Sequence, residues 1–293
     1  NCCTCVTIMH ADFINIETMM DLSEARIALL AALENTNIPV ICSFTFEKQG
    51  RTLMGNTPEA IVYTVQSLGA SAVGANCSGG PKDLLPVISK MKKVSSIPLI
   101  VQPNAGLPQI DRGEVAYSLS PEQMVQDAVA LINAGANMIG GCCGTTPDHI
   151  KKLADLIGRL KPAKSESEPQ NCICSRYQYT PVDGLFQRLI EIYVDANTQP
   201  FDIMDKMTGS DIEDPIPLLI FDTEMDPLII KSSLADIQSI IKQPMVFKIN
   251  DVNTAKIVLR HYDGRAGILT DSIGNTDLSS IINKYGAYII NNR

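Results

Sequence analysis

The first 160 residues repeat one pattern, an apolar run of strand length followed by a longer run with helical periodicity. The pattern occurs five times with a period of about 30 residues, which is typical of βα units in a parallel sheet. We expect strands at Phe13–Glu17, Pro39–Phe46, Ala72–Cys77, Leu99–Asn104 and Asn137–Cys143. We expect helices at Leu22–Leu33, Pro58–Leu68, Pro81–Met91, Pro121–Ala134 and Pro147–Leu160. A parallel α/β fold is the class that this repetition predicts.

A charged segment with several serines and prolines, residues 163–175, interrupts the pattern and is typical of a linker. Strand and helix patterns then resume. The expected strands are Leu218–Asp222, Met245–Asn250, Gly267–Thr270 and Ala287–Ile290. The expected helices are Leu185–Val194, Pro227–Ile241, Thr254–His261 and Leu278–Tyr285. We therefore predict two domains, residues 1–162 and residues 176–293, the second a partial α/β unit.

Polar and sulfur-bearing residues follow the apolar part of each strand in the first domain. They are Glu17 and Thr18, Ser43 and Thr45, Asn76 and Cys77, Asn104, and Cys142 and Cys143. In a βα barrel the C-terminal ends of the strands meet at one face, and that face carries the active site. We therefore expect Cys77, Cys142 and Cys143 to converge.

Adjacent cysteines on a regular strand point to opposite faces of the sheet. The glycines on both sides of Cys142–Cys143 allow the chain to leave strand geometry, so that both sulfurs can turn toward one point. With Cys77 as a third sulfur, the set is typical of a catalytic zinc site, which has three protein ligands and an open fourth position. The alternative is that these cysteines are packed in the core. Their regular place at strand ends favours the metal site.

Four further residues are candidates for binding a substrate. Glu17 could cap a helix or pair with Arg26, but its place at a strand end favours an ammonium partner. Ser43 and Thr45 could line the same pocket. Asn104 is a candidate at the rim of the pocket, where its side chain can also shape the backbone.

These residues resemble the signature of the homocysteine S-methyltransferase family. The similar segments are Ile16–Met19, Ser43–Phe46 with Gly50–Thr52, Gly74–Cys77, Pro103–Gly106 and Gly140–Thr145. The resemblance covers about residues 11–162 and is greatest to the homocysteine-binding module of cobalamin-dependent methionine synthases.

The resemblance implies a (βα)8 barrel in which Cys77, Cys142 and Cys143 hold zinc and Glu17 holds the amino group of homocysteine. It implies methyl transfer to the homocysteine thiol, giving methionine. Methylcobalamin, carried by a partner domain or subunit, and ultimately methyltetrahydrofolate would be the donor. Betaine and S-methylmethionine are alternative donors in this family. A catalytically silent zinc- or thiol-binding remnant is a second hypothesis, and an unrelated α/β-barrel enzyme with coincidental cysteines is a third.

The sequence also departs from the family. Three further βα units open the family's barrel and have no counterpart before Asn1, so we expect an N-terminally incomplete barrel or fragment. Gln102 stands where an acid is common. Residues 243–288 faintly resemble the folate-binding barrel of methionine synthases, with Asp271 at the place of a pterin-contacting asparagine. The alternative to a separate second domain is that its βα units close the first barrel.

The charge and composition of the chain exclude some classes of binding partner. The net charge of −8 and the absence of tryptophan argue against nucleic acid and anionic membranes as partners. Nine cysteines without regular spacing do not predict a disulfide framework, so we expect a reducing, cytoplasmic setting.

Cys2 and Cys5 form a C-x-x-C motif that we interpret as incidental, as we do Cys172 and Cys174 in the expected linker. We interpret Cys42 as core and His149 as a surface or helix-packing residue rather than a ligand. A homo-oligomer is the assembly that an open barrel favours.

Overall fold

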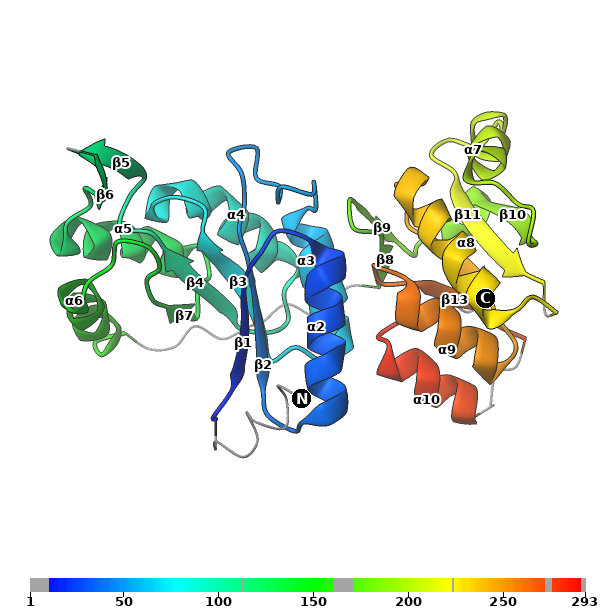
Figure 1. Ribbon diagram of the computed structural model, residues 1–293, viewed down its shortest axis with the longest axis horizontal. Helices are drawn as coiled ribbons and strands as arrows, with labels where there is room; N and C mark the ends of the chain where they lie inside the picture. Colours follow the sequence, from blue (N-terminus) through cyan, green and yellow to red (C-terminus); the bar gives the residue numbers. More distant parts are fainter. Residues whose placement is uncertain (1–10, 112, 161–170, 223, 272–275, 291–293) are drawn as a thin grey trace. The chain divides into compact units, whose positions relative to one another are not determined.

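The computed structural model describes residues 11–111, 113–160, 171–222, 224–271 and 276–290 (Figure 1). The C-x-x-C motif of Cys2 and Cys5 lies outside the described residues. The chain divides into two compact units, Asn1–Pro169 and Gln170–Arg293. In the part of the chain that is described, no helix has the length and apolar character needed to cross a membrane.

The first unit alternates parallel strands with helices, as its sequence predicts. Its strands in the main sheet are β1 (Ile14–Met19), β2 (Val40–Phe44), β3 (Ala72–Cys77), β4 (Leu99–Pro103) and β7 (Met138–Ile139). Its helices are α2 (Leu22–Asn35), α3 (Pro58–Leu68), α4 (Pro81–Val94), α5 (Pro121–Asn133) and α6 (Pro147–Ile157). Four of these helices begin with proline, which lacks the N–H that a first helical residue cannot use. A short hairpin, β5 (Pro108–Asp111) and β6 (Glu114–Tyr117), is inserted between β4 and α5.

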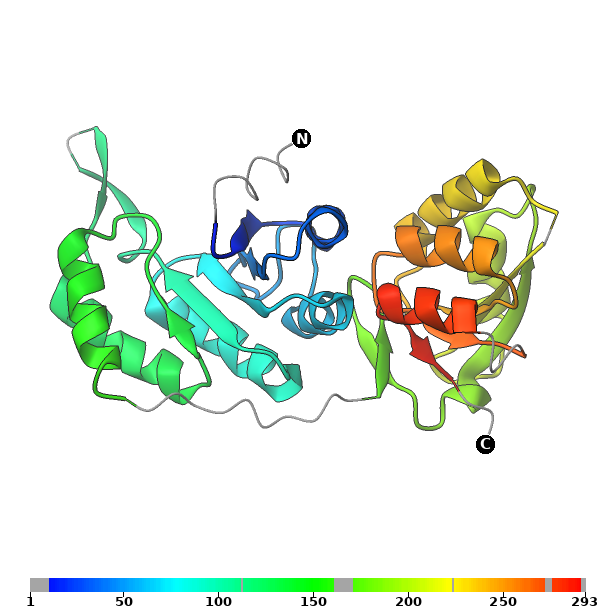
Figure 2. The same ribbon diagram turned by 90° about the horizontal axis from the view of Figure 1, so that it is seen from below.

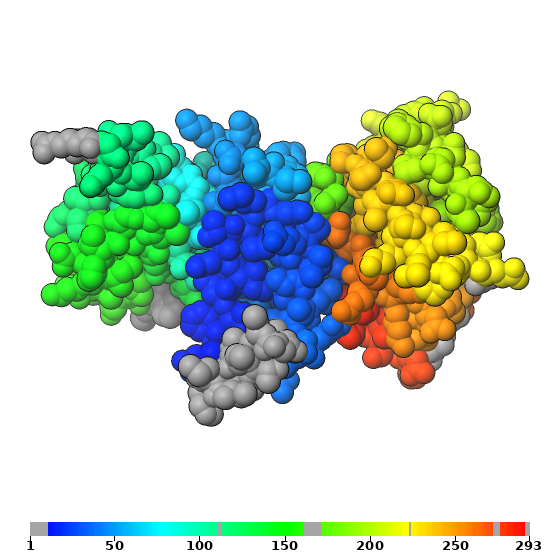
Figure 3. All heavy atoms as spheres, viewed as in Figure 1, coloured from blue at the N-terminus to red at the C-terminus, as the bar shows by residue number. Residues whose placement is uncertain are grey.

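The main sheet is open and all parallel, with the strand order β1-β2-β3-β4-β7. Because crossover connections between parallel strands are right-handed, a sheet built in sequence order places all its helices on one side. Figure 2 shows the helices of this unit outside the curved sheet. β1 and α2 lie at the surface in Figure 3, with Phe13, Met20 and Ile27 exposed. The described strands therefore form an arc rather than a closed barrel.

The second unit contains its own parallel sheet, with the strand order β10-β11-β12-β13-β14. The strands are β10 (Leu189–Val194), β11 (Ile216–Phe221), β12 (Val246–Lys248), β13 (Gly267–Leu269) and β14 (Tyr288–Ile289). The helices are α7 (Pro200–Thr208), α8 (Pro227–Ile240), α9 (Val252–His261) and α10 (Thr276–Lys284). Because these strands pair among themselves, the alternative in which they complete the first sheet is wrong for the described residues.

Two expectations for the second half were also wrong. The expected helix Leu185–Val194 is a short 3-10 helix (Leu185–Arg188) followed by β10. In β10, Ile192 and Val194 are buried while Glu191 and Tyr193 are exposed, which is the alternation of a strand. The expected linker was too long, because Cys172 and Cys174 are buried in β8 (Cys172–Cys174), which pairs with β9 (Tyr179–Pro181).

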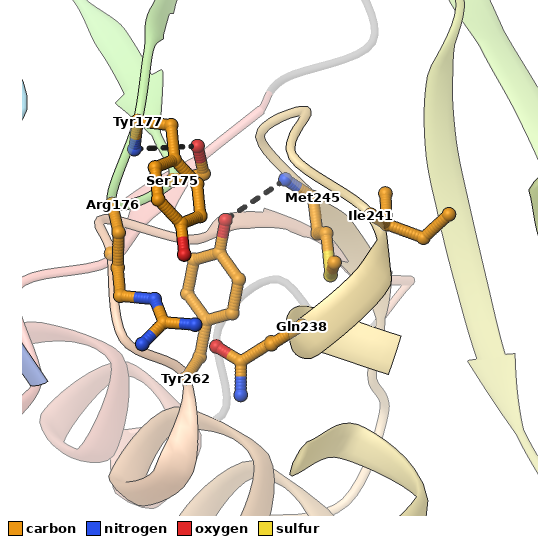
Figure 4. Close-up of a pocket in the computed structure, with 8 residues that line it drawn as sticks. Ser175, Arg176, Tyr177, Gln238, Ile241, Met245 and Tyr262 are labelled. Atoms are coloured by element: carbon orange, nitrogen blue, oxygen red, sulfur yellow. Dashed lines mark hydrogen bonds between the residues drawn. The ribbon is translucent and has the colours of Figure 1, made fainter. Parts of the chain in front are cut away.

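The β8–β9 hairpin packs at the N-terminal ends of β12 and β13. The Tyr262 hydroxyl donates to the carbonyl of Cys174 and accepts from the N–H of Met245. Ser175, which follows β8, donates to the carbonyl of Lys242. The cavity beside these residues has a volume of about 10 Å³, about the size of one water molecule (Figure 4). This end of the unit is packed structure rather than a binding site, as expected for the N-terminal face of parallel strands.

Gly74, in the middle of β3, lies where the backbone of β4 leaves no room for a side chain. A Cβ atom at this position would lie 1.7 Å from the carbonyl oxygen of Ile100 on β4. We predict that Gly74→Ala lowers the free energy of unfolding by about 3 kcal/mol or more, because a backbone atom cannot move aside cheaply. Urea unfolding followed by circular dichroism measures this change. Gly158→Ala is the matched control, because Gly158 is in helical geometry with ordinary space around it. Equal stability of the two variants would contradict the prediction.

Candidate metal centre

Three cysteine sulfurs meet at the C-terminal edge of the first sheet. Cys77 is the last residue of β3, and Cys142 and Cys143 follow β7 after two glycines. The Cys77 sulfur lies 3.4 Å from that of Cys142 and 3.6 Å from that of Cys143. The sulfurs of Cys142 and Cys143 are 3.9 Å apart. Within the described residues, this is the one group of three potential metal-ligating side chains that comes together.

The backbone turns that bring the sulfurs together are pinned to β4. The N–H of Cys142 donates to the carbonyl of Pro103, and the carbonyl of Cys143 accepts from the N–H of Ala105. The side-chain oxygen of Asn104 accepts from the N–H of Cys143 at 3.0 Å. β7 ends at Ile139, earlier than expected, so neither cysteine lies on a regular strand. The prediction that the local backbone turns both sulfurs to one point is confirmed.

The spacing of the sulfurs fits a tetrahedral metal ion. With Zn–S bonds of about 2.3 Å and tetrahedral angles, two ligating sulfurs are about 3.8 Å apart. The three measured distances, 3.4, 3.6 and 3.9 Å, lie close to this value. Among the described residues no further His, Cys, Asp or Glu side chain joins the three sulfurs. Three soft sulfur donors are the donor set of a zinc site that keeps one position for a substrate.

Asn76, the neighbour of Cys77, joins the ends of three strands. Its side-chain oxygen accepts from the N–H of Thr18 on β1 and from the hydroxyl of Ser43 on β2. Its side-chain nitrogen donates to the Thr18 hydroxyl at 2.6 Å and lies 3.9 Å from the Cys142 sulfur. The amide is fully buried, so these bonds are made out of water and hold the edge of the sheet in one arrangement.

The candidate substrate residues occupy different environments. Ser43 is fully buried, and the hydroxyl of Thr45 bonds the carbonyl of Asn76 at 3.1 Å, so both serve the interior of the edge. Asn104 is buried and holds the Cys143 backbone. Glu17 is exposed within β1, two residues before the strand ends, and one of its carboxylate oxygens accepts from the Asn15 amide at 3.0 Å. Of the four, Glu17 presents a charge to solvent.

His149 caps the first turn of α6 and packs in the interior, in agreement with the helix-packing interpretation of its sequence position. It is buried in the first turn of α6, and its Nδ1 accepts from the N–H of Thr146 at 3.1 Å. The other ring nitrogen therefore carries the proton and donates to the carbonyl of Leu119 at 2.9 Å. The imidazole ties α6 to the segment that precedes α5.

Sequence reasoning missed Tyr117, whose ring lies against Gly144 in the turn that carries the cysteine pair. Tyr117 ends the inserted hairpin, which lies outside the βα repeat. The signal that was available is Gly144, one residue after the cysteine pair, where the aromatic ring needs the space.

The metal-free thiols are unlike one another. Burial, reinforced by hydrogen bonds with the two other cysteines, raises the pKa of Cys77 to about 12. Hydrogen bonds, first from Cys77 and then from Cys142 and Tyr117, lower the pKa of Cys143. The exposed Cys143 thiol thus loses its proton more readily than the Cys77 thiol.

We predict that metal-free protein is alkylated by iodoacetamide at Cys143 before Cys77. At pH 8 a thiol of pKa about 12 is ionised in only about one molecule in ten thousand, whereas the lowered pKa of Cys143 gives it a much larger thiolate fraction. Peptide mass spectrometry at a substoichiometric dose of reagent records the order. Cys42, whose pKa burial raises to about 12, is the unreactive internal control. First modification at Cys77 would contradict the prediction.

With this geometry in view, comparison with known proteins is informative. The model of the family described as homocysteine S-methyltransferase matches residues 4–157, about half of the chain. The chain belongs to the homocysteine S-methyltransferase family. The match includes all three converging cysteines.

Two methionine synthases are among the relatives. The protein of Mycobacterium leprae is 34% identical over 155 residues, which cover 51% of this chain and 13% of that protein. The protein of Mycobacterium tuberculosis is 31% identical over 177 residues, which cover 58% of this chain and 15% of that protein. The chain therefore spans only a small part of the length of these relatives.

Among solved structures, the homocysteine methyltransferase MmuM from Escherichia coli is similar in its apo form. Its identity is 23%, with 52% of this chain and 51% of that chain covered and a TM-score of 0.44. Its metallated form has an identity of 22% and a TM-score of 0.42, with 52% and 47% of the two chains covered.

Proposed function

We propose that this chain binds one zinc ion through Cys77, Cys142 and Cys143 and serves zinc-dependent methyl transfer to the thiol of homocysteine, forming methionine. The observation that carries the proposal is the set of sulfur distances, 3.4 to 3.9 Å, at the C-terminal edge of a parallel sheet. Membership of the homocysteine S-methyltransferase family supports homocysteine as the methyl acceptor.

Zinc held by three thiolates would leave one position for a substrate thiol and lower the pKa of that thiol, so that a thiolate is present at neutral pH. Other residues of the chain would keep the zinc ligands in position. Asn104 holds the backbone of Cys143, and Asn76 holds the strand that carries Cys77 in place. No side-chain base is required for this chemistry, which agrees with the packing role of His149.

Glu17 is the proposed partner of the homocysteine ammonium group. It lies in the C-terminal half of β1, and its carboxylate accepts a hydrogen bond from Asn15 while remaining exposed. A carboxylate that is oriented by a neighbour but open to solvent can accept further charge-assisted hydrogen bonds. In the proposed site the zinc would take the sulfur end of the amino acid and Glu17 its amino end.

We propose methylcobalamin on a partner domain or subunit as the methyl donor, with methyltetrahydrofolate as the ultimate donor. The two methionine synthases among the relatives support methionine as the product. Betaine and S-methylmethionine are alternative donors, and a catalytically silent zinc-binding remnant is the alternative to an enzyme. We further propose that the first unit supplies five units of a (βα)8 barrel and that the second unit is part of a folate-binding barrel.

We predict that the purified chain binds about one zinc ion and that serine at Cys77, Cys142 or Cys143 abolishes or strongly weakens binding, because a site with two sulfurs cannot complete the shell. Elemental analysis after dialysis measures the stoichiometry. Cys42→Ala is the matched control, since Cys42 is buried on β2 away from the three sulfurs. Full retention of zinc in all three serine variants would exclude the proposed ligands.

We predict that zinc-loaded protein binds homocysteine but not homoserine, its oxygen analogue, because the soft site selects sulfur. Glu17→Gln should weaken homocysteine binding by about tenfold through the loss of a charged hydrogen bond. The same variant should bind 4-mercaptobutyrate, which lacks the amino group, as well as the unsubstituted protein does. Isothermal titration calorimetry measures all three affinities. Equal weakening for both thiols would show that Glu17 does not contact the amino group.

A further inference from the structure

The C-terminal half of β1 contains a β-bulge. Pairing with β2 is regular up to Ile16 and resumes at Met19, with one more residue on β1 than on β2 in between. Glu17 and Thr18 are therefore two residues of β1 that lie opposite a single residue of β2, Ser43. A bulge of this kind leaves one residue without its ladder partner and changes the direction of the side chains beside it, and bulges are frequent next to active sites.

The backbone of Thr18 is unusual within this bulge. Its φ is 60°, in the left-handed region. A β-branched residue seldom adopts this conformation, because its Cβ atom crowds the following carbonyl oxygen, and it persists only where the surrounding structure holds it. A disfavoured conformation is thus kept at the residue that follows Glu17, the proposed partner of the substrate ammonium group.

The side chain of Asn76 on β3 holds Thr18 in this conformation. Its oxygen accepts from the Thr18 N–H at 2.9 Å, and its nitrogen donates to the Thr18 hydroxyl at 2.6 Å. Ser43, opposite the bulge, donates its hydroxyl to the same Asn76 oxygen at 2.9 Å. Asn76 and Ser43 are fully buried, so these bonds are shielded from water. The bulge of β1 is therefore fixed by a residue two strands away.

The same amide borders the thiol cluster. Asn76 directly precedes Cys77, and its side-chain nitrogen lies 3.9 Å from the Cys142 sulfur. The bonds between Thr18 and Asn76 thus connect the strand that carries Glu17 to the strand that carries Cys77. In the proposed site these strands hold the amino end and the sulfur end of one substrate.

We propose that Thr18 is a positioning residue for substrate specificity, whose hydroxyl, bonded to Asn76, holds the bulge that directs the Glu17 carboxylate toward the amino group of an amino-acid thiol. The inference rests on the proposed function and deepens it, because it explains how the site would recognise the amino end of its substrate. Thr18 acts through Glu17 and does not itself contact the substrate.

Thr18→Val tests the proposal, because it removes the hydroxyl and keeps the shape of the side chain. Isothermal titration calorimetry of the zinc-loaded variant should show homocysteine bound about 10-fold more weakly and 4-mercaptobutyrate, which lacks the amino group, bound as before. Thr18→Ser keeps the hydroxyl and should restore homocysteine binding to within about twofold. Thr36→Val is the matched control, since this threonine is also half-buried and donates its hydroxyl to the Ala32 carbonyl at 3.1 Å, at the end of α2.

A double-mutant cycle shows whether Thr18 acts through Glu17. The double variant Glu17→Gln with Thr18→Val should bind homocysteine as weakly as Glu17→Gln alone, because the carboxylate that Thr18 directs is already gone. A loss of about 100-fold, the product of two independent losses of about tenfold, would overturn the inference. Thr18→Ala is the second variant without the hydroxyl, and it should give the same pattern if the valine variant does not fold.

The outcomes separate this inference from the proposed function. If Thr18→Val weakens both thiols equally, Thr18 acts on the thiol cluster or the fold, and the inference is wrong while the proposed function stands. If Thr18→Val binds homocysteine as the unsubstituted chain does, Thr18 has no positioning role. If the unsubstituted chain binds neither thiol, the proposed function is wrong and the inference with it.

Discussion

A single buried amide organises the edge of the sheet that carries the thiol cluster. Asn76 bonds the backbone and hydroxyl of Thr18 and the hydroxyl of Ser43, so it links the ends of β1, β2 and β3. Parallel strands separated by helices have no turn that fixes their ends relative to one another, and here a side chain does so. Since an unpaired buried amide is costly, the network is stable only when all three strands are in place. The position of Cys77, one residue further along, depends on this arrangement.

The repeat of strands and helices was predictable because its signals are local. Apolar runs at a period of about 30 residues identify βα units without knowledge of the fold. The meeting of Cys77 with Cys142 and Cys143 was predictable for a related reason. Parallel strands in sequence order place their C-terminal ends at one edge, so residues far apart in sequence become neighbours by topology alone. The methyl donor was not predictable in this way, because it depends on partner molecules and no local sequence pattern identifies them.

The expectations that proved wrong also have physical explanations. The segment before Val194 carries apolar residues that suit either a helix or a strand, and its pairing with β11 decided the outcome. Cys172 and Cys174 follow a charged, proline-bearing stretch, and their burial depends on contacts with residues about 90 positions later, such as Arg265. Tyr117 was missed because hairpin insertions interrupt the repeat and leave no periodic signal. In the first two cases tertiary contacts overrode the sequence signal, and in the third there was no periodic signal to read.

The wide separation of the cysteines couples metal binding to folding. Cys77 and Cys142 are 65 residues apart, and β4, the inserted hairpin and α5 lie between them in the chain. An unfolded chain therefore offers at most the adjacent pair of sulfurs, and the third arrives only when β3, β4 and β7 have paired. Structural zinc sites contribute about 10–16 kcal/mol at neutral pH, as much as the entire stability of many domains. In an open five-stranded sheet, an ion bound at this edge would hold β3, β4 and β7 together and raise the free energy of unfolding of the first unit. The stability of the second unit would depend on its own core.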